Sequence, residues 1–139
     1  MNERSNIILS SLDFKRINKC IAEAKQNRTI NDFEIQRLTY ELSVAEIREP
    51  RLIPDDIVTM NSVVSFTFLN YPKQAHVKIV YPHEANLKEW KISIFSQMAN
   101  ALLGHKVGDV IEWIGPAGEM SMRIDKIAYQ PEAAGHFDL

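Results

Sequence analysis

Residues 90–104 read WKISIFSQMANALLG. Apolar side chains alternate over the first six residues, which is typical of a strand with one face in a core. Three of them share that face: Trp90, Ile92 and Ile94. Ser96 follows at once and is a good helix cap, and Gly104 is a residue that ends helices. The stretch therefore predicts a strand over 90–95 and a short helix over 97–103.

Two more strands are predicted downstream of this stretch. KVGD at 106–109 has the glycine and aspartate of a turn, and a strand is expected over 110–114. GPAG at 115–118 then reads as a hairpin loop that leads into a last strand extending toward Tyr129. The alternating apolar side chains of that last strand are Met120, Met122 and Ile124.

Two further strands are predicted upstream. Apolar residues alternate in a strand-like stretch over 58–68, and YPKQ at 71–74 reads as a turn. A strand over 76–81 follows, so residues 54–139 hold about five strands. Most of these strands should be antiparallel and wrapped around one short helix, and this domain belongs to the α+β class.

The first 53 residues carry a helical pattern instead. Apolar residues fall at helical spacing in two matched stripes, each with intervals of three, four and three. The stripes are Phe14, Ile17, Ile21 and Ala24, then Ile35, Leu38, Leu42 and Ala45. Residues 27–31 interrupt the pattern, with Ser10 or Ser11 as the first cap and Thr29 or Asn31 as the second. We expect a short antiparallel coiled-coil hairpin over 1–53, whose base leans on a β-domain over 54–139.

Composition excludes several classes of function. The chain has 139 residues, 45% of them apolar, and a net charge of −2, so it lacks the field that attracts nucleic acid or an anionic membrane. We expect neither direct sequence-specific nucleic-acid binding nor membrane insertion, since the apolar run at 7–9 is far too short. A single cysteine, Cys20, allows no internal disulfide and fits a reducing, cytoplasmic location.

No residue pattern predicts an active site. There is no glycine-rich phosphate loop, and one cysteine with scattered histidines fits no zinc spacing. Asp32 and Glu34 sit at the projecting tip of the hairpin, but residues two apart on a helix point in different directions and converge poorly on an ion. We therefore expect no catalytic residue, no metal site and no cofactor, and a protein that is not an enzyme.

Several segments resemble a known family. KISIFSQMANALLG at 91–104, VGD at 107–109 and PAGE at 116–119 are similar to the C-terminal domain of the bacterial GreA/GreB transcript-cleavage factors, which has an FKBP-like fold. DIVTMNS at 56–62 and YQPEAAG at 129–135 resemble the Rnk group of that family, the regulators of nucleoside diphosphate kinase. The hairpin matches by pattern and position alone.

The resemblance implies a partner, the core RNA polymerase. Gre factors place the C-terminal domain on the rim of the secondary channel and push a long hairpin inward, where two tip acids help to bind a metal ion for transcript cleavage. This hairpin is shorter, and its tip reads Asn31-Asp32-Phe33-Glu34, whereas Gre factors separate their acids by two residues. The resemblance thus implies competition with Gre-type factors without cleavage, through a tip formed by Arg28, Asn31, Asp32 and Glu34.

The rim contact carries over by position to four residues: Phe95, Ser96, Gln97 and Met98. Gre factors can carry an acid, a serine and a proline at the first three, so the contact chemistry differs here. An exposed Phe95 and Met98 would supply apolar anchors. The alternative is that both belong to the core.

Two other functions stay open. A peptidyl-prolyl isomerase would need an open aromatic pocket, for which Trp90, Trp113 and Phe66 are candidates, although their alternation more simply places them in a core. The name of the Rnk group suggests direct binding to a nucleoside diphosphate kinase. A proline-peptide isomerisation assay tests the first function, and co-purification without polymerase tests the second.

Overall fold

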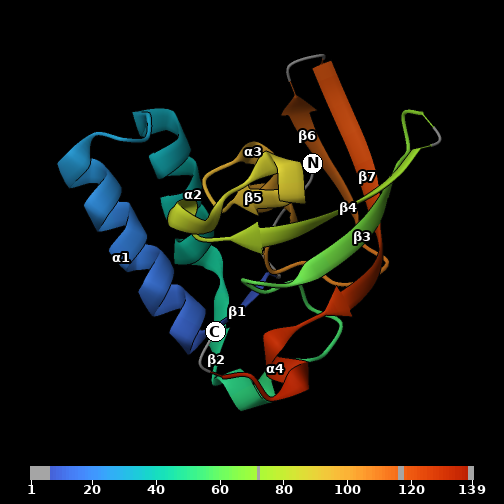
Figure 1. Cartoon of the computed structure of the whole chain (residues 1–139), viewed down its shortest axis with the longest axis horizontal. Coiled ribbons are helices and arrows are strands. Elements are labelled where there is room, and N and C mark those ends of the chain that lie inside the picture. The colour runs from blue at the N-terminus through green and yellow to red at the C-terminus, as the bar shows by residue number, and fades with distance from the viewer. Residues whose placement is uncertain (1–6, 72, 116–117, 138–139) are drawn as a thin grey trace.

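The computed structural model describes residues 7–71, 73–115 and 118–137. A helical hairpin lies along one side of a curved five-stranded sheet (Figure 1). The predicted α+β class, with an antiparallel hairpin followed by a mainly antiparallel β-domain, is confirmed. Pro72 in the predicted turn and Pro116 and Ala117 in the predicted loop lie outside the described residues.

The hairpin consists of α1, Ser11–Asn27, and α2, Asp32–Val44. Ser10 caps α1 by accepting from the Asp13 N–H at 3.0 Å, and Asn31 caps α2 by accepting from the Glu34 N–H at 2.8 Å. Both apolar stripes face inward as predicted, with Phe14 and Ala45 partly buried at the ends. The fully buried members are Ile17, Ile21, Ala24, Ile35, Leu38 and Leu42.

Two short strands that the sequence did not reveal close the base of the hairpin. β1, Ile8–Ser10, pairs in parallel with β2, Glu46–Arg48. The Ile8 N–H donates to the Gly104 carbonyl at 3.1 Å, so this base is attached to the β-domain. Gly104 has a φ of +81°, and a Cβ there would lie 2.7 Å from the Ile7 Cβ. Only glycine allows so close an approach.

The five-stranded sheet has the order β5-β4-β3-β7-β6. Its neighbours are antiparallel except for β4 and β5, which run in parallel. The bounds are β3, Val63–Phe68; β4, Lys73–Val80; β5, Lys91–Ser93; β6, Val110–Gly115; and β7, Gly118–Tyr129.

Three predicted boundaries in the sheet are wrong. The alternation at Val58 and Met60 belongs to a buried loop, so β3 begins only at residue 63. Lys73 and Gln74, predicted in a turn, already belong to β4. The predicted strand over 90–95 shrinks to three residues. It starts only at Lys91, because Trp90 has a φ of 61° in the left-handed region, and it ends at Ser93, where the chain turns.

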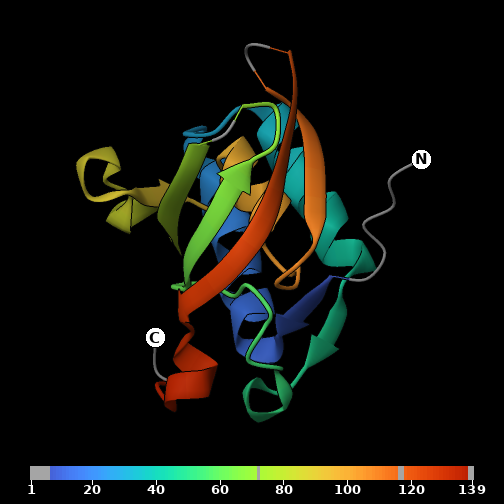
Figure 2. The ribbon, with the colours of Figure 1, turned by 90° about the vertical axis from the view of Figure 1, so that its right-hand side faces the viewer.

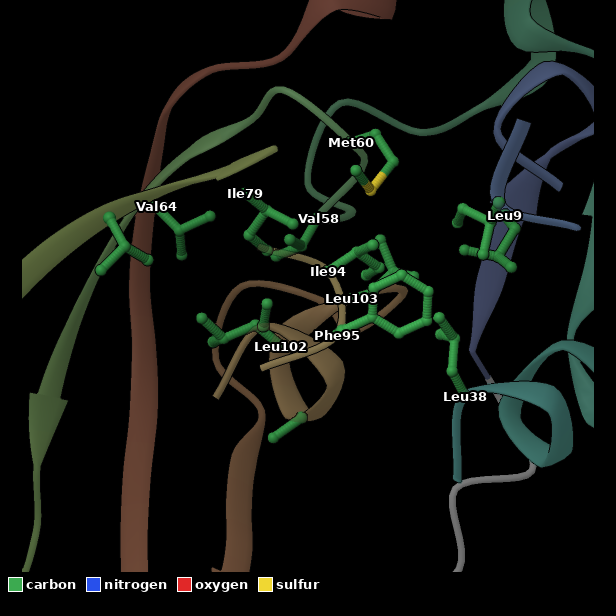
Figure 3. Packing of buried hydrophobic residues seen from close by; sticks show 14 of the residues in the cluster. Leu9, Leu38, Val58, Met60, Val64, Ile79, Ile94, Phe95, Leu102 and Leu103 are labelled. Carbon is green, nitrogen blue, oxygen red and sulfur yellow. The ribbon is translucent and has the colours of Figure 1, made fainter. Parts of the chain in front are cut away.

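One helix, α3, Gln97–Leu102, packs in the hollow of the sheet, and Ser96 caps it as predicted. The shared core joins α3, the inner face of the sheet and the hairpin, and Figure 3 shows Leu9, Leu38, Leu103 and Phe95 around one centre. Short 3₁₀ turns at Pro50–Leu52, Pro82–Glu84 and Leu87–Glu89 and a last helix, α4, Pro131–Ala134, complete the chain (Figures 1 and 2). Among the described residues, every helix is too short or too polar to cross a membrane.

Candidate functional site

Phe95 is buried, so of the two alternatives at this position the core residue is correct and the exposed anchor is wrong. Its side chain is 3% exposed and packs beside Leu38 of α2 (Figure 3). After β5 the chain turns sharply, because the Ser93 Oγ accepts from the Phe95 N–H at 3.1 Å and the Ser96 N–H donates to the Ser93 carbonyl at 2.9 Å. This turn directs Phe95 into the core and leaves the next three residues nearer the surface.

The rest of the expected rim contact is partly exposed. The Ser96 Oγ accepts from the Ala99 N–H at 3.2 Å, and the Gln97 amide donates to the Ile114 carbonyl on β6. Met98 is half-buried and lines a cavity of about 470 Å³. The surface that a partner could contact here is therefore made by Gln97, Met98 and the first turn of α3.

The hairpin tip lies against the β-domain, where we had expected a projecting tip. Arg28 is exposed with a φ of 53°, Asp32 is exposed, and Glu34 is half-buried. The loop contributes to a hollow of about 180 Å³ whose lining includes Asn27, Thr29, Ile30, Pro82, His83 and Phe95. Among the described residues, no group of three or more His, Cys, Asp or Glu side chains could hold a metal ion.

Arg37 connects the tip to the expected rim contact, and sequence reasoning missed it. Its Nη2 donates to the Phe95 carbonyl at 3.2 Å, and its guanidinium lies 5.8 Å from the centre of the Phe33 ring. Phe33 itself is 70% exposed. The spacing of four residues on α2 hints at the contact with Phe33. Nothing local to Arg37 indicates a partner 58 residues away.

Substituting Arg37→Met is expected to lower the free energy of unfolding by about 1–2 kcal/mol, because it leaves the buried side of the Phe95 carbonyl without its donor. Urea unfolding at equilibrium measures this change. Arg28→Met is the matched control, because Arg28 is exposed and a surface change there should stay within about 0.5 kcal/mol. Equal effects of the two substitutions would contradict the role given to Arg37.

A buried carboxyl joins the hairpin to the β-domain. Asp13 lies in the first turn of α1, and its side chain is only 2% exposed. Its Oδ2 accepts from the Met60 N–H at 3.1 Å, and the Tyr81 hydroxyl lies 3.5 Å from its Oδ1. Burial raises the pKa of Asp13 to about 7, and the charge of Glu132 contributes to this increase. The hydrogen bond from the Met60 N–H and the charge of Arg16 lower the pKa, but by less.

Cys20 behaves as a structural residue. It is half-buried beside the apolar stripe of α1, and burial raises the pKa of its thiol, with a smaller contribution from Glu23. A raised pKa disfavours the thiolate, which is the reactive form. The geometry around Cys20 thus gives no support for a nucleophile.

A match to a protein-family model identifies the family of this chain. The model described as "Transcription elongation factor, GreA/GreB, C-term" matches residues 53–129, which include the whole five-stranded sheet and α3. The chain belongs to the GreA/GreB family. The family resemblance inferred from residues 91–119 is confirmed.

Relatives extend this GreA/GreB assignment to the hairpin. The chain is 35% identical over 136 residues to the Escherichia coli K12 regulator of nucleoside diphosphate kinase, covering 96% of this chain and 97% of that protein. It is 35% identical over 106 residues to the transcription elongation factor GreA of Orientia tsutsugamushi, covering 76% of this chain and 67% of the relative. The resemblance to the Rnk group is therefore confirmed as well.

A solved structure shares the fold. It is a prokaryotic transcription elongation factor GreA/GreB from Nitrosomonas europaea, which is 35% identical to this chain and superposes with a TM-score of 0.72. The match covers 88% of this chain and 99% of that one. These relatives bear the names of regulators and elongation factors, and none of the three names describes a catalyst.

Proposed function

We propose that this GreA/GreB-family protein docks on core RNA polymerase at the rim of the secondary channel and competes there with Gre-type factors without stimulating transcript cleavage. The observation that carries the proposal is the hairpin itself. α2 has 13 residues, or about 20 Å of helix, and its tip lies against Pro82 and His83. A hairpin this short and this closely packed supports occupancy of the entrance over entry to the catalytic centre.

The same geometry supports a particular polymerase-binding surface. Ser96, Gln97 and Met98 are the partly exposed members of the segment that the family resemblance points to. Arg37 fixes that segment to the hairpin through the Phe95 carbonyl. Arg28, Asn31, Asp32 and Glu34 then face the channel from the tip. A polymerase partner also places the protein in the cytoplasm.

Binding of the purified protein to core RNA polymerase, with a Gre factor as competitor, tests this function. We expect the Gre factor to displace the protein, and backtracked complexes to show no added cleavage. A combined Gln97→Ala and Met98→Ala variant should bind about tenfold more weakly. Lys126→Ala, on the exposed side of β7, is the matched control. Absence of binding at micromolar concentration would rule out the proposal.

A second candidate function is direct regulation of a nucleoside diphosphate kinase. It is favoured by the name of the Escherichia coli relative, which aligns over 96% of this chain. Co-purification of the kinase with this protein, in a preparation free of polymerase, would support direct binding. An effect on kinase levels that disappears when polymerase binding is lost would instead assign the effect to transcription.

A further inference from the structure

Part of strand β4 has an open edge. β4 pairs with β3 over residues 73–78, whereas its other neighbour, β5, pairs only with residues 78–80. The Lys78 N–H donates to the Trp90 carbonyl on the β5 side at 2.8 Å. Backbone groups alternate along a strand, so the N–H and C=O of Gln74 and His76 point to that same side. Among the described residues, no strand pairs with them there.

Trp90 creates this opening. In its left-handed conformation it donates its N–H to the Leu87 carbonyl at 3.2 Å and so withdraws that N–H from the sheet. The segment 82–90 then leads away from the sheet, at the left of Figure 2. Proteins usually cover or pair their strand edges.

The two outermost strands of the sheet, β5 and β6, each have an edge residue whose backbone finds a partner. Asn86 and Lys91 exchange two backbone hydrogen bonds, of 2.9 and 3.0 Å, along the outside of β5. On β6, the Ile114 carbonyl accepts from the Gln97 side chain. The open stretch of β4 thus differs from these positions on β5 and β6.

A cavity of about 470 Å³ wraps around the open edge. Its lining comes from both faces of β4, with Ala75 and Val77 on the core side and Gln74 and His76 on the other. Apart from Lys73, the remaining wall is apolar: Phe66, Phe68, Leu87, Trp90, Ile92 and Met98. Leu87 and Trp90 are 79% and 57% exposed, so they stand at the mouth of the cavity.

The charges around the cavity are mainly positive. Lys73 lines it, and Lys78 and Lys88 follow the lining residues Val77 and Leu87 in the chain. Glu89 forms a salt bridge with Lys91 at 2.9 Å, and the charge of Glu84 also interacts with Lys91. The two segments that contribute to its lining, 73–78 and 84–91, thus carry four lysines and two glutamates in a chain whose net charge is −2. This local reversal favours an acidic partner.

We propose that the open edge of β4 at Gln74–His76 is a strand-addition site for an extended segment of a partner protein that alternates apolar and acidic residues. The backbone of the segment would pair with Gln74 and His76, and its apolar side chains would enter the cavity between Trp90 and Met98. Its carboxylates, which alternate with those apolar side chains, would lie on the face of Gln74 and His76, which also carries Lys78. The site shares Met98 with the surface proposed for polymerase, but it does not depend on that role.

The conformation of Trp90 supports a binding role. A bulky residue with positive φ is strained, and glycine would adopt the same backbone without strain. The Trp90 ring is mostly exposed, 5.9 Å from the His76 ring, so it adds little to the core. Strain held at an exposed aromatic residue is typical of a functional surface.

The probe is the capped peptide acetyl-Glu-Val-Glu-Val-Glu-Val-Glu-amide, added to the full chain while the backbone amide signals are followed by NMR. We expect the Gln74 and His76 amides to shift and to exchange more slowly with solvent. The same peptide methylated on its three central backbone nitrogens should not bind. A peptide with lysine in place of glutamate should bind about tenfold more weakly.

Two variants test the protein side. His76→Pro removes one outward N–H and leaves the bonds to β3, so it should fold and weaken peptide binding about tenfold. His76→Thr, which keeps the N–H, is its matched control and should bind normally. Trp90→Gly removes the ring and the strain together, so it should fold at least as well as the original and bind the peptide at least tenfold more weakly.

Several outcomes would overturn the proposal. They are undiminished binding of the methylated peptide, equal binding of the lysine peptide, normal binding by Trp90→Gly, and absence of binding at millimolar peptide. Concentration-dependent dimerisation that His76→Pro abolishes would assign the edge to a second copy of this chain. If the protein binds the peptide but does not bind polymerase, only the proposed function is wrong and the strand-addition site stands.

Discussion

Substituting Phe95→Ala is expected to lower the free energy of unfolding by about 3–5 kcal/mol, the usual cost of removing a buried aromatic ring. The Phe95 ring lies in the shared core between the hairpin and α3 and is 3% exposed. The cavity left behind would also loosen the attachment of Arg37, whose guanidinium donates to the Phe95 carbonyl. Such a loss is a large part of the stability of a domain of this size.

Urea unfolding followed by circular dichroism measures this loss. Met98→Ala is the control, because Met98 is half-buried and should cost less. A Phe95→Ala variant as stable as the original protein would show that the ring is not part of the core. If Phe95→Ala is destabilised as expected, a loss of polymerase binding in this variant reflects impaired folding. Only the substitutions of Gln97 and Met98 then test the proposed polymerase-binding surface.

Substituting Asp13→Asn is expected to stabilise the protein above neutral pH. The pKa of Asp13 is about 7 in the folded chain, against an ordinary value of 3.8. The folded state therefore holds the proton more tightly, and this contribution to stability is fully present below pH 3.8 and lost as the pH rises through about 7. Asparagine stays neutral, and its carbonyl can still accept from the Met60 N–H.

The stability gained from Asp13→Asn should be larger by about 2–3 kcal/mol at about pH 8 than at about pH 5. Chemical unfolding at both pH values, with Asp32→Asn as the exposed control, measures the difference. A constant difference between the variant and the original protein across this range would show that Asp13 is ionised in both states. The same buried group predicts that the hairpin is released from the β-domain more easily at higher pH.

The elements governed by local chemistry could be predicted from sequence. The two helical stripes and the caps at Ser10, Asn31 and Ser96 depend on residues at most four positions apart. The alternating pattern did not predict correctly where the Phe95 side chain lies. The chain leaves the strand after Ser93, and beyond that point an odd or even position no longer tells which face a side chain takes. The pattern failed in the same way for Trp90, which was expected in a core and is mostly exposed.

The rest of the candidate site depends on contacts that are distant along the chain. The bond from Arg37 to Phe95 spans 58 residues, and that from Asp13 to Met60 spans 47. β1 and β2 have three residues each, which is too few for any periodic signal. The open edge of β4 depends on where β5 stops, and a single left-handed residue decides that.

The parallel pairing of β1 with β2 allows the hairpin to change in length while its base stays the same. Ile8 lies opposite Glu46 and Ser10 opposite Arg48, so the chain enters and leaves the hairpin at adjacent points. Residues added or removed at the loop near Arg28 change the reach of the hairpin and leave the β1–β2 pair in place. Reach and anchorage can therefore vary separately, and one β-domain can carry hairpins of different lengths without being redesigned.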